Sequence, residues 1–177
     1  MIELKTVVLV GTFSVAVLVG CDPSGDDSAS DTELGDSYVN FESEAVGDDY
    51  LVDNVECTSA DCCQEIHVNS FESDTELENF FGEYLPNEPV PPVEFESRVA
   101  LVSYSAACPN LWYRLAVDEI QLEGTQATFF QTLTIPLYGP TSLGRPYNVI
   151  SVSQDDYDWE TLEVELTAVE DTGGPYY

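Results

Sequence analysis

The pattern of hydrophobic and polar positions predicts one amphipathic helix near the middle of the chain. Ser73 and Glu76 have the spacing of a capping box, which satisfies free backbone N–H groups where a helix begins. Pro86 ends the segment, because proline cannot continue a helix. Between them, apolar side chains recur at intervals of three and four residues and form one stripe: Leu77, Phe80, Phe81, Tyr84 and Leu85. We expect this stripe to contact the core.

Strands are predicted on both sides of this helix. Residues 65–69 alternate, with Ile66 and Val68 on one face and His67 on the other. Residues 99–102 are continuously apolar, which is typical of a strand covered on both faces. The remaining alternating or apolar segments predict strands at 111–117, 120–122, 126–135, 147–152 and 162–166.

Local breaks in the pattern predict how these strands are connected. The pair Asp118-Glu119 shifts the alternation by one residue, which indicates a β-bulge. Residues 123–125 read as a hairpin turn, and residues 136–146 as a long loop with three prolines. The predicted fold class is therefore α+β and β-rich, with an antiparallel sheet of about five or six strands and one packed helix. We place it in a single domain at residues 50–169.

The first twenty residues have the composition of a secretory signal. Lys5 is the single early cation, residues 7–19 are mostly apolar, and the small residue Gly20 precedes Cys21. The alternative is an uncleaved membrane-spanning helix, but the apolar stretch of about 15 residues is shorter than the roughly 20 that span a bilayer. We therefore expect residues 1–20 to be removed on export.

Residues 18–21, Leu-Val-Gly-Cys, resemble the lipobox of bacterial lipoproteins. The resemblance implies cleavage before Cys21 and lipidation of its thiol, palmitate included. Membrane lipid attached through Cys21 then becomes the anchor, because two or more acyl chains hold a protein stably on a membrane. The expected location is the bacterial cell envelope, in the periplasm or on the outer surface.

The segments at the two ends of the mature chain have few apolar residues. Residues 21–49 are rich in Asp, Ser and Gly and lack Lys and Arg, so we expect a disordered acidic tether, with Tyr38, Val39 and Phe41 as a candidate edge strand near its end. Residues 170–177 are expected to form a loose tail.

The charge of the chain restricts its partners. The sequence holds 34 acidic residues against four Lys and Arg, for a formal charge of −30. Such a surface repels phosphates, so nucleic acid is excluded as a partner. Two interpretations stay open: a cationic ligand or partner, or solubility in a saline habitat.

The cysteines after the lipobox form an even set, typical of an oxidising compartment: Cys57, Cys62, Cys63 and Cys108. A bridge between the adjacent Cys62 and Cys63 is strained. We therefore expect one of these two to pair with Cys57 and the other with Cys108.

The sequence contains no motif that indicates an enzymatic reaction. His67 is the single histidine, and no nucleophile elbow or phosphate-binding glycine loop occurs. The alternative is a metal-binding or metal-carrying protein that uses Cys57, Cys62, Cys63 and His67 as ligands. We expect disulfides to take these sulfurs, and we predict a non-enzyme without cofactor or metal.

A family resemblance covers about half of the chain. It rests on Phe95, the run 99–102, Tyr113 and the Pro146-Tyr147 step. These residues resemble the C-terminal domain family of PrcB, an accessory lipoprotein of a bacterial surface protease complex. That family usually has Gly-Gly-Tyr at the second strand, where this chain keeps Tyr113 but neither glycine. The resemblance implies an accessory role and a protein partner.

The candidate contact residues are Arg145, Tyr147, Trp112 and Tyr113. Arg145 is a rare cation within the predicted loop 136–146, and loops often carry binding residues. The aromatic residues, with Tyr104, suggest a platform for a glycan or peptide on a structural surface lipoprotein; the other interpretation is that these rings pack in the core. The main hypothesis is a membrane-anchored, non-catalytic protein-interaction domain.

Overall fold

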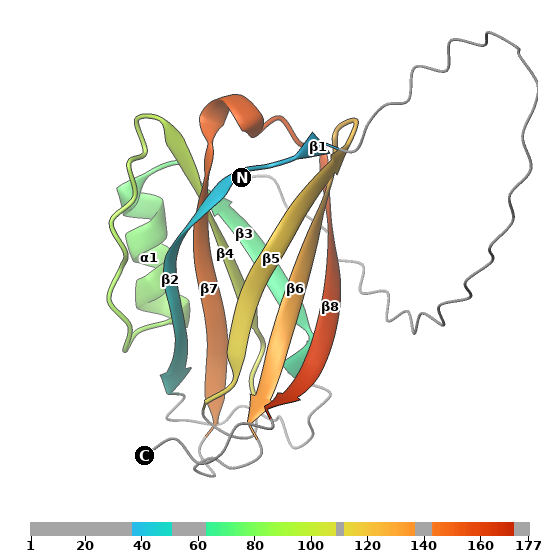
Figure 1. Cartoon of the computed structure of the whole chain (residues 1–177). Helices are drawn as coiled ribbons and strands as arrows, with labels where there is room; N and C mark the ends of the chain where they lie inside the picture. Colours follow the sequence, from blue (N-terminus) through green and yellow to red (C-terminus); the bar gives the residue numbers. More distant parts are fainter. Residues whose placement is uncertain (1–36, 51–62, 109–111, 137–142, 172–177) are drawn as a thin grey trace, which may run out of the picture.

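The computed structural model describes residues 37–50, 63–108, 112–136 and 143–171. Within these ranges the chain forms two four-stranded sheets packed face to face, with one α-helix on the outer face of one sheet (Figure 1). We call the sheet under the helix the covered sheet and the other the open sheet. The predicted β-rich α+β class with one packed helix is confirmed.

The elements have the following bounds. The covered sheet has the order β2-β7-β4-β3, formed by Phe41–Tyr50, Gly144–Ser153, Arg98–Ser105 and Ile66–Phe71. The open sheet has the order β1-β5-β6-β8, formed by Ser37–Tyr38, Arg114–Glu123, Gln126–Pro136 and Thr161–Asp171. Helix α1 spans Asp74–Tyr84, and a short 3-10 helix, η2, spans Gln154–Asp156.

The strand arrangement differs from the single antiparallel sheet of five or six strands expected from the sequence. The described residues hold eight strands in two sheets, and β6 and β8 are parallel. The reason is that β7 lies between them in the chain but belongs to the covered sheet. A chain that crosses to the other sheet and returns runs in its original direction. Alternation along a strand does not reveal such a crossing.

Helix α1 begins as the sequence predicted. The Ser73 side chain accepts a hydrogen bond from the backbone N–H of Glu76, and the Glu76 carboxylate accepts one from the N–H of Glu72. The predicted stripe is buried at Leu77, Phe80, Phe81 and Leu85, whereas Tyr84 stays partly exposed. The stripe packs on apolar side chains of β4 and β7, namely Ala100, Val102, Tyr104, Tyr147 and Val149.

Strand β4 explains the continuously apolar run. Val99 and Leu101 face the core between the two sheets, while Ala100 and Val102 face the helix. Every residue of β4 after Arg98 is buried. In contrast, β6 alternates between buried and partly exposed positions, because one face of the open sheet meets solvent.

The irregular positions of the β5–β6 hairpin were also predicted. The pairing register shifts between Val117 and Glu119, where the bulge was expected. The turn lies between Glu123 and Gln126, and Gly124 has a φ of 64°, a conformation that favours glycine.

Three predicted boundaries are wrong. Residues 37–49 belong to the fold and not to the tether, because Phe41 packs on the core and β2 pairs with β7 along its length. The loop 136–146 ends early, since Gly144 already begins β7. Strand β8 continues to Asp171, past the expected start of the tail at 170. The signal residues 1–20 and Cys21 lie outside the described residues.

Candidate functional site

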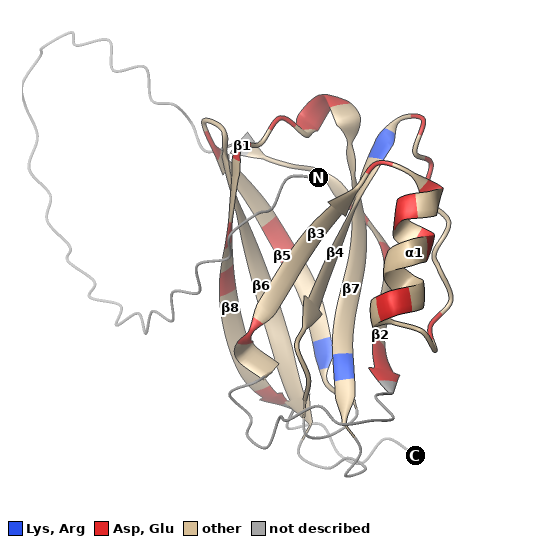
Figure 2. Cartoon of the chain, turned by 180° about the vertical axis from the view of Figure 1, so that it is seen from behind, with Lys and Arg blue, Asp and Glu red and all other residues tan. Residues whose placement is uncertain are grey.

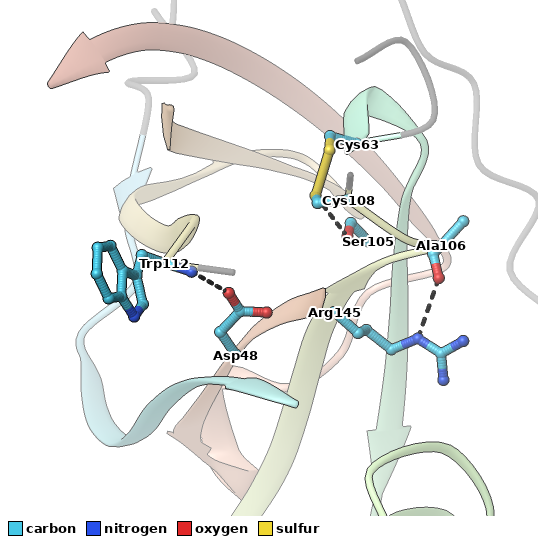
Figure 3. The surroundings of a disulfide bond; sticks show 7 residues. All are labelled: Asp48, Cys63, Ser105, Ala106, Cys108, Trp112 and Arg145. Carbon is cyan, nitrogen blue, oxygen red and sulfur yellow. Dashed lines mark hydrogen bonds between the residues drawn. A yellow bond between two sulfur atoms is a disulfide. The ribbon is translucent and has the colours of Figure 1, made fainter. Parts of the chain in front are cut away.

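The disulfide joins the chain before β3 to the chain after β4. Cys63 and Cys108 are both buried, and their Cα atoms lie 4.9 Å apart (Figure 3). The side chains of Ser105 and Cys108 lie within hydrogen-bond distance, 3.5 Å from oxygen to sulfur. The bond confirms the expected link from the Cys62/Cys63 pair to Cys108. Cys57 and Cys62 lie outside the described residues.

Arg145 lies in β7 and not in a loop, which corrects its assignment as a loop contact. Its Nε donates to the carbonyl of Ala106 at 3.1 Å and its Nη1 to the carbonyl of Tyr84 at 2.6 Å. The guanidinium also lies 5.9 Å from the ring centre of Tyr104. Helix α1 has no basic residue in its last turn, so Arg145 supplies the positive charge that favours a helix C-terminus. These contacts give Arg145 a structural role.

Two of the other predicted contact residues are core residues. Tyr113 and Tyr147 are 3% and 2% exposed. The ring of Tyr147 lies against Gly47, where an added Cβ would approach the phenol oxygen to 2.5 Å. Its hydroxyl donates to Glu88 at 2.7 Å, and burial, together with this bond, raises the pKa of Tyr147. Because Tyr104 is also buried, the expected aromatic platform is not formed on the surface.

Trp112 differs from these residues because it is 54% exposed. Its backbone φ is 81°, and no other non-glycine residue in the described chain has a positive φ. This conformation costs of order 1–3 kcal/mol and persists only where neighbouring groups hold it. The backbone N–H of Trp112 donates to Oδ2 of Asp48 at 2.6 Å, which ties the start of β5 to β2 (Figure 3).

Asp48 is therefore the residue that holds Trp112. Its Oδ1 is buried and accepts no hydrogen bond of normal geometry from the described residues. The pKa of Asp48 is raised to about 7, mainly by burial and in smaller part by the neighbouring Asp49 and Glu88, while the N–H groups of Trp112 and Tyr113 oppose the rise. The contact thus joins a carboxylate that titrates near neutrality to a strained backbone.

Asp49 faces the opposite side of β2 and is fully buried. Burial raises its pKa, whereas Asn87 beside it lowers the pKa in part. No described residue donates to either Asp49 oxygen with normal hydrogen-bond geometry. The end of β2 therefore places two adjacent carboxylates on opposite faces of the strand, Asp49 fully buried and Asp48 partly buried.

His67 does not form a metal site in the described part of the chain. Its ring stacks at 5.3 Å on Tyr104, and its Nε2 lies 3.6 Å from the Glu65 carboxylate. No group of three or more His, Cys, Asp or Glu side chains in the described ranges is placed to hold a metal ion. Cys63 is bonded to Cys108, so the proposed set of Cys57, Cys62, Cys63 and His67 loses one thiolate.

Nothing in the sequence distinguished Asp48 as a candidate site residue. The residue follows Gly47 in an acidic, glycine-containing segment that resembles the tether before it. What distinguishes Asp48 from the other carboxylates is the pairing of β2 with β7 and the approach of Trp112, which is 64 residues away in the chain.

Comparison of the chain with protein-family models, with curated protein sequences and with solved structures found no match. Among the described residues, no helix has the length and apolar character needed to cross a membrane.

Proposed function

We propose that the protein is a lipid-anchored lipoprotein of the bacterial cell envelope whose β-sandwich domain binds a protein partner without catalysing a reaction. The surface around Trp112 is the proposed contact. In this proposal Cys21 carries the lipid, and residues 21–36 link the anchor to the domain.

The exposed indole of Trp112 carries this proposal. Tryptophan is among the residues that contribute most binding energy in protein interfaces. Here the side chain is 54% exposed, and its position depends on a left-handed backbone fixed by the partly buried carboxylate of Asp48. A surface tryptophan without a binding role would not require a strained backbone held in place by a second residue, as Asp48 holds Trp112.

Charge supports a basic partner. Asp and Glu residues are spread over α1, β2 and β8 (Figure 2), and the described ranges hold three arginines, Arg98, Arg114 and Arg145. Of these, Arg98 bonds Glu42 and Ser151, and Arg145 bonds backbone carbonyls. A surface of this kind speeds encounter with a cationic partner and repels anionic ones.

The anchor and the partner class rest on the sequence. The lipobox at residues 18–21 supports lipidation of Cys21 after export. The resemblance to the PrcB accessory domain suggests that the partner belongs to a surface protease complex. An accessory role agrees with a domain that we propose to present a contact residue and no catalytic group.

The proposal is tested by crosslinked capture from the native envelope. We expect one dominant partner with the wild-type chain and its loss with Trp112→Ala. Tyr38→Ala is the matched control, because Tyr38 is also an exposed aromatic residue, at 64%, but lies in β1 of the open sheet. Capture from Cys21→Ala measures how far partner binding depends on the anchor.

Two results would contradict the proposal. Equal capture by wild type and Trp112→Ala would remove Trp112 from the contact. A chain that carries no lipid, shown by mass spectrometry of the envelope protein, would remove the anchor.

The remaining cysteines are proposed to form a second bridge. With Cys63 bonded to Cys108, the expectation from the sequence leaves Cys57 to pair with Cys62. A thiol titration of the unfolded, unreduced lipoprotein should then find no free thiol. Two free thiols together with one bound zinc or copper ion would instead support the metal-binding alternative.

A further inference from the structure

Strand β2 is an edge strand with a long free edge. It spans Phe41–Tyr50 and pairs with β7 on one side, and no described strand pairs with its other side. The free edge of a strand presents unpaired backbone N–H and C=O groups that another extended chain can pair with. The pairing register of β2 shifts between Ser43 and Ala45, and residues 45–50 beyond this shift are long enough for an additional strand of ordinary length.

Two exposed apolar side chains lie at this strand. Val46 is 51% exposed and sits two residues before Asp48, hence on the same face of β2. Trp112 is held at Asp48 by its backbone N–H, and Figure 3 shows its indole directed away from the disulfide. In peptide recognition by strand addition, backbone pairing provides affinity and side-chain contacts of this kind provide specificity.

The negative charge around this edge favours a basic segment as the added strand. Strand β2 contains Glu42, Glu44, Asp48 and Asp49 and no basic residue. Arg98 bonds Glu42 at 2.9 Å, and Asp49 is fully buried near Arg145. The negative charge that β2 offers to a partner therefore comes from Glu42, Glu44 and Asp48. The sequences of residues 21–36 and 51–62 are themselves acidic and lack Lys and Arg, so charge disfavours both as strands on this edge.

We propose that β2 receives an extended basic segment of a protein partner, which adds to the covered sheet as a fifth strand and packs apolar side chains on Val46 and Trp112. This inference rests on the proposed function and names the chemistry of its partner. The added strand pairs with the backbone of β2, its cationic side chains face the carboxylates of Glu42 and Glu44, and its apolar side chains cover the indole.

The test uses the full chain in detergent and a labelled ten-residue peptide of alternating Lys and Val. Fluorescence anisotropy should show saturable binding of this peptide. The same peptide with every backbone nitrogen methylated keeps its charges and side chains but cannot donate hydrogen bonds, and we expect it to bind at least tenfold more weakly. A peptide of alternating Glu and Val should not bind.

A matched pair of variants locates the site. Val46→Lys places a cation on β2 and should weaken binding of the Lys-Val peptide at least tenfold. Val169→Lys makes the same change at a 40% exposed valine of β8, another acidic edge strand, and should change binding less than twofold. Circular dichroism and thermal unfolding of both variants show whether each is folded.

Three outcomes would overturn the inference. Equal binding of the methylated peptide would show attraction by charge without strand pairing. Equal weakening by both lysine variants would remove β2 as the site, and absence of any peptide binding would remove the strand addition itself. If the peptides fail while Trp112→Ala still abolishes partner capture, strand addition is wrong and the proposed function stands.

Discussion

The two sheets of the sandwich use the same kind of strand in different surroundings. The open sheet is covered on one face, so its strands β5 and β6 alternate between buried and accessible residues. The covered sheet lies between the inter-sheet core and helix α1, and its central strands β4 and β7 are buried on both faces over most of their length. The covered sheet therefore holds two hydrophobic layers where the open sheet holds one.

This difference determines where carboxylates are buried and where their pKa values are raised. Charges on the outer face of the open sheet meet water, as Glu163 and Glu165 of β8 do. At the end of β2 in the covered sheet, Asp49 is fully buried and Asp48 is partly buried, and burial raises the pKa values of both. Asp48 belongs to the covered sheet, and Trp112, which it holds, precedes β5 of the open sheet.

The largest predicted difference between the sheets comes from truncating the helix contact. Phe81→Ala removes a side chain that is 1% exposed between α1 and the covered sheet. We expect a loss of about 3–5 kcal/mol in the free energy of unfolding. Thr128→Ala, on the outer face of the open sheet, should change it by less than about 0.5 kcal/mol. Urea unfolding measures both, and similar losses would contradict the two-layer description.

Removal of the disulfide should have the next largest effect. The bond between Cys63 and Cys108 closes a segment with a sequence separation of 45 residues. In the chain-entropy model this amounts to about 4 kcal/mol, an upper value for a measured loss that is typically about 2–4 kcal/mol. The double variant Cys63→Ala/Cys108→Ala tests this by urea unfolding and leaves an even set of cysteines after Cys21. An unchanged free energy of unfolding would contradict the bond.

The pH dependence of stability tests the buried carboxylate of β2. Because the folded pKa of Asp48, about 7, exceeds the ordinary value of 3.8, the native state binds more protons than the unfolded state. This contribution is present at low pH and is lost as the pH rises through 7. Between pH 5 and pH 8, we expect Asp48 to lower the free energy of unfolding by about 2 kcal/mol.

The matched variants for this prediction are Asp48→Asn and Asp118→Asn. Both remove one carboxylate, but Asp118 is exposed in the open sheet and accepts from Thr132. We expect Asp48→Asn to flatten the fall in stability between pH 5 and pH 8, whereas Asp118→Asn should retain it. Parallel pH profiles for wild type and Asp48→Asn would show that Asp48 is ionised throughout this range.

The smallest predicted effect concerns Arg145. Lysine cannot reproduce the two-armed contact with the carbonyls of Ala106 and Tyr84, so Arg145→Lys should cost about 1 kcal/mol. Partner capture should be unchanged, because the contacts of Arg145 are structural. Unfolding and capture assays measure the two effects, and loss of capture at unchanged stability would return Arg145 to the binding surface.

The hydrophobic pattern was sufficient to predict the elements whose contacts lie nearby in the chain. The capping box at Ser73, the apolar stripe of α1, the turn at Gly124 and the bulge after Val117 are local features, and each was predicted. The continuously apolar sequence of β4 also indicated burial on both faces, because a strand that is buried on both faces has apolar residues at successive positions.

Contacts between distant segments were not predictable from this pattern. One sequence of strands is compatible with a single sheet or with two, and only long-range pairing decides that β7 leaves the sheet of β6 and β8. The interpretation of residues 37–49 as a tether failed for the same reason. The segment is acidic, and it gains stability as a strand only when β7 is beside it.

By itself, the sequence determined the β-rich class, the helix with its cap, and the surplus of negative charge. The tertiary structure decided that Arg145 caps a helix, that Tyr113 and Tyr147 are buried, and that Trp112 is presented by Asp48. The physical reason is the range of the interactions. Propensity and periodicity act over a few residues, whereas desolvation of a carboxylate or exposure of an indole depends on which distant strands come together.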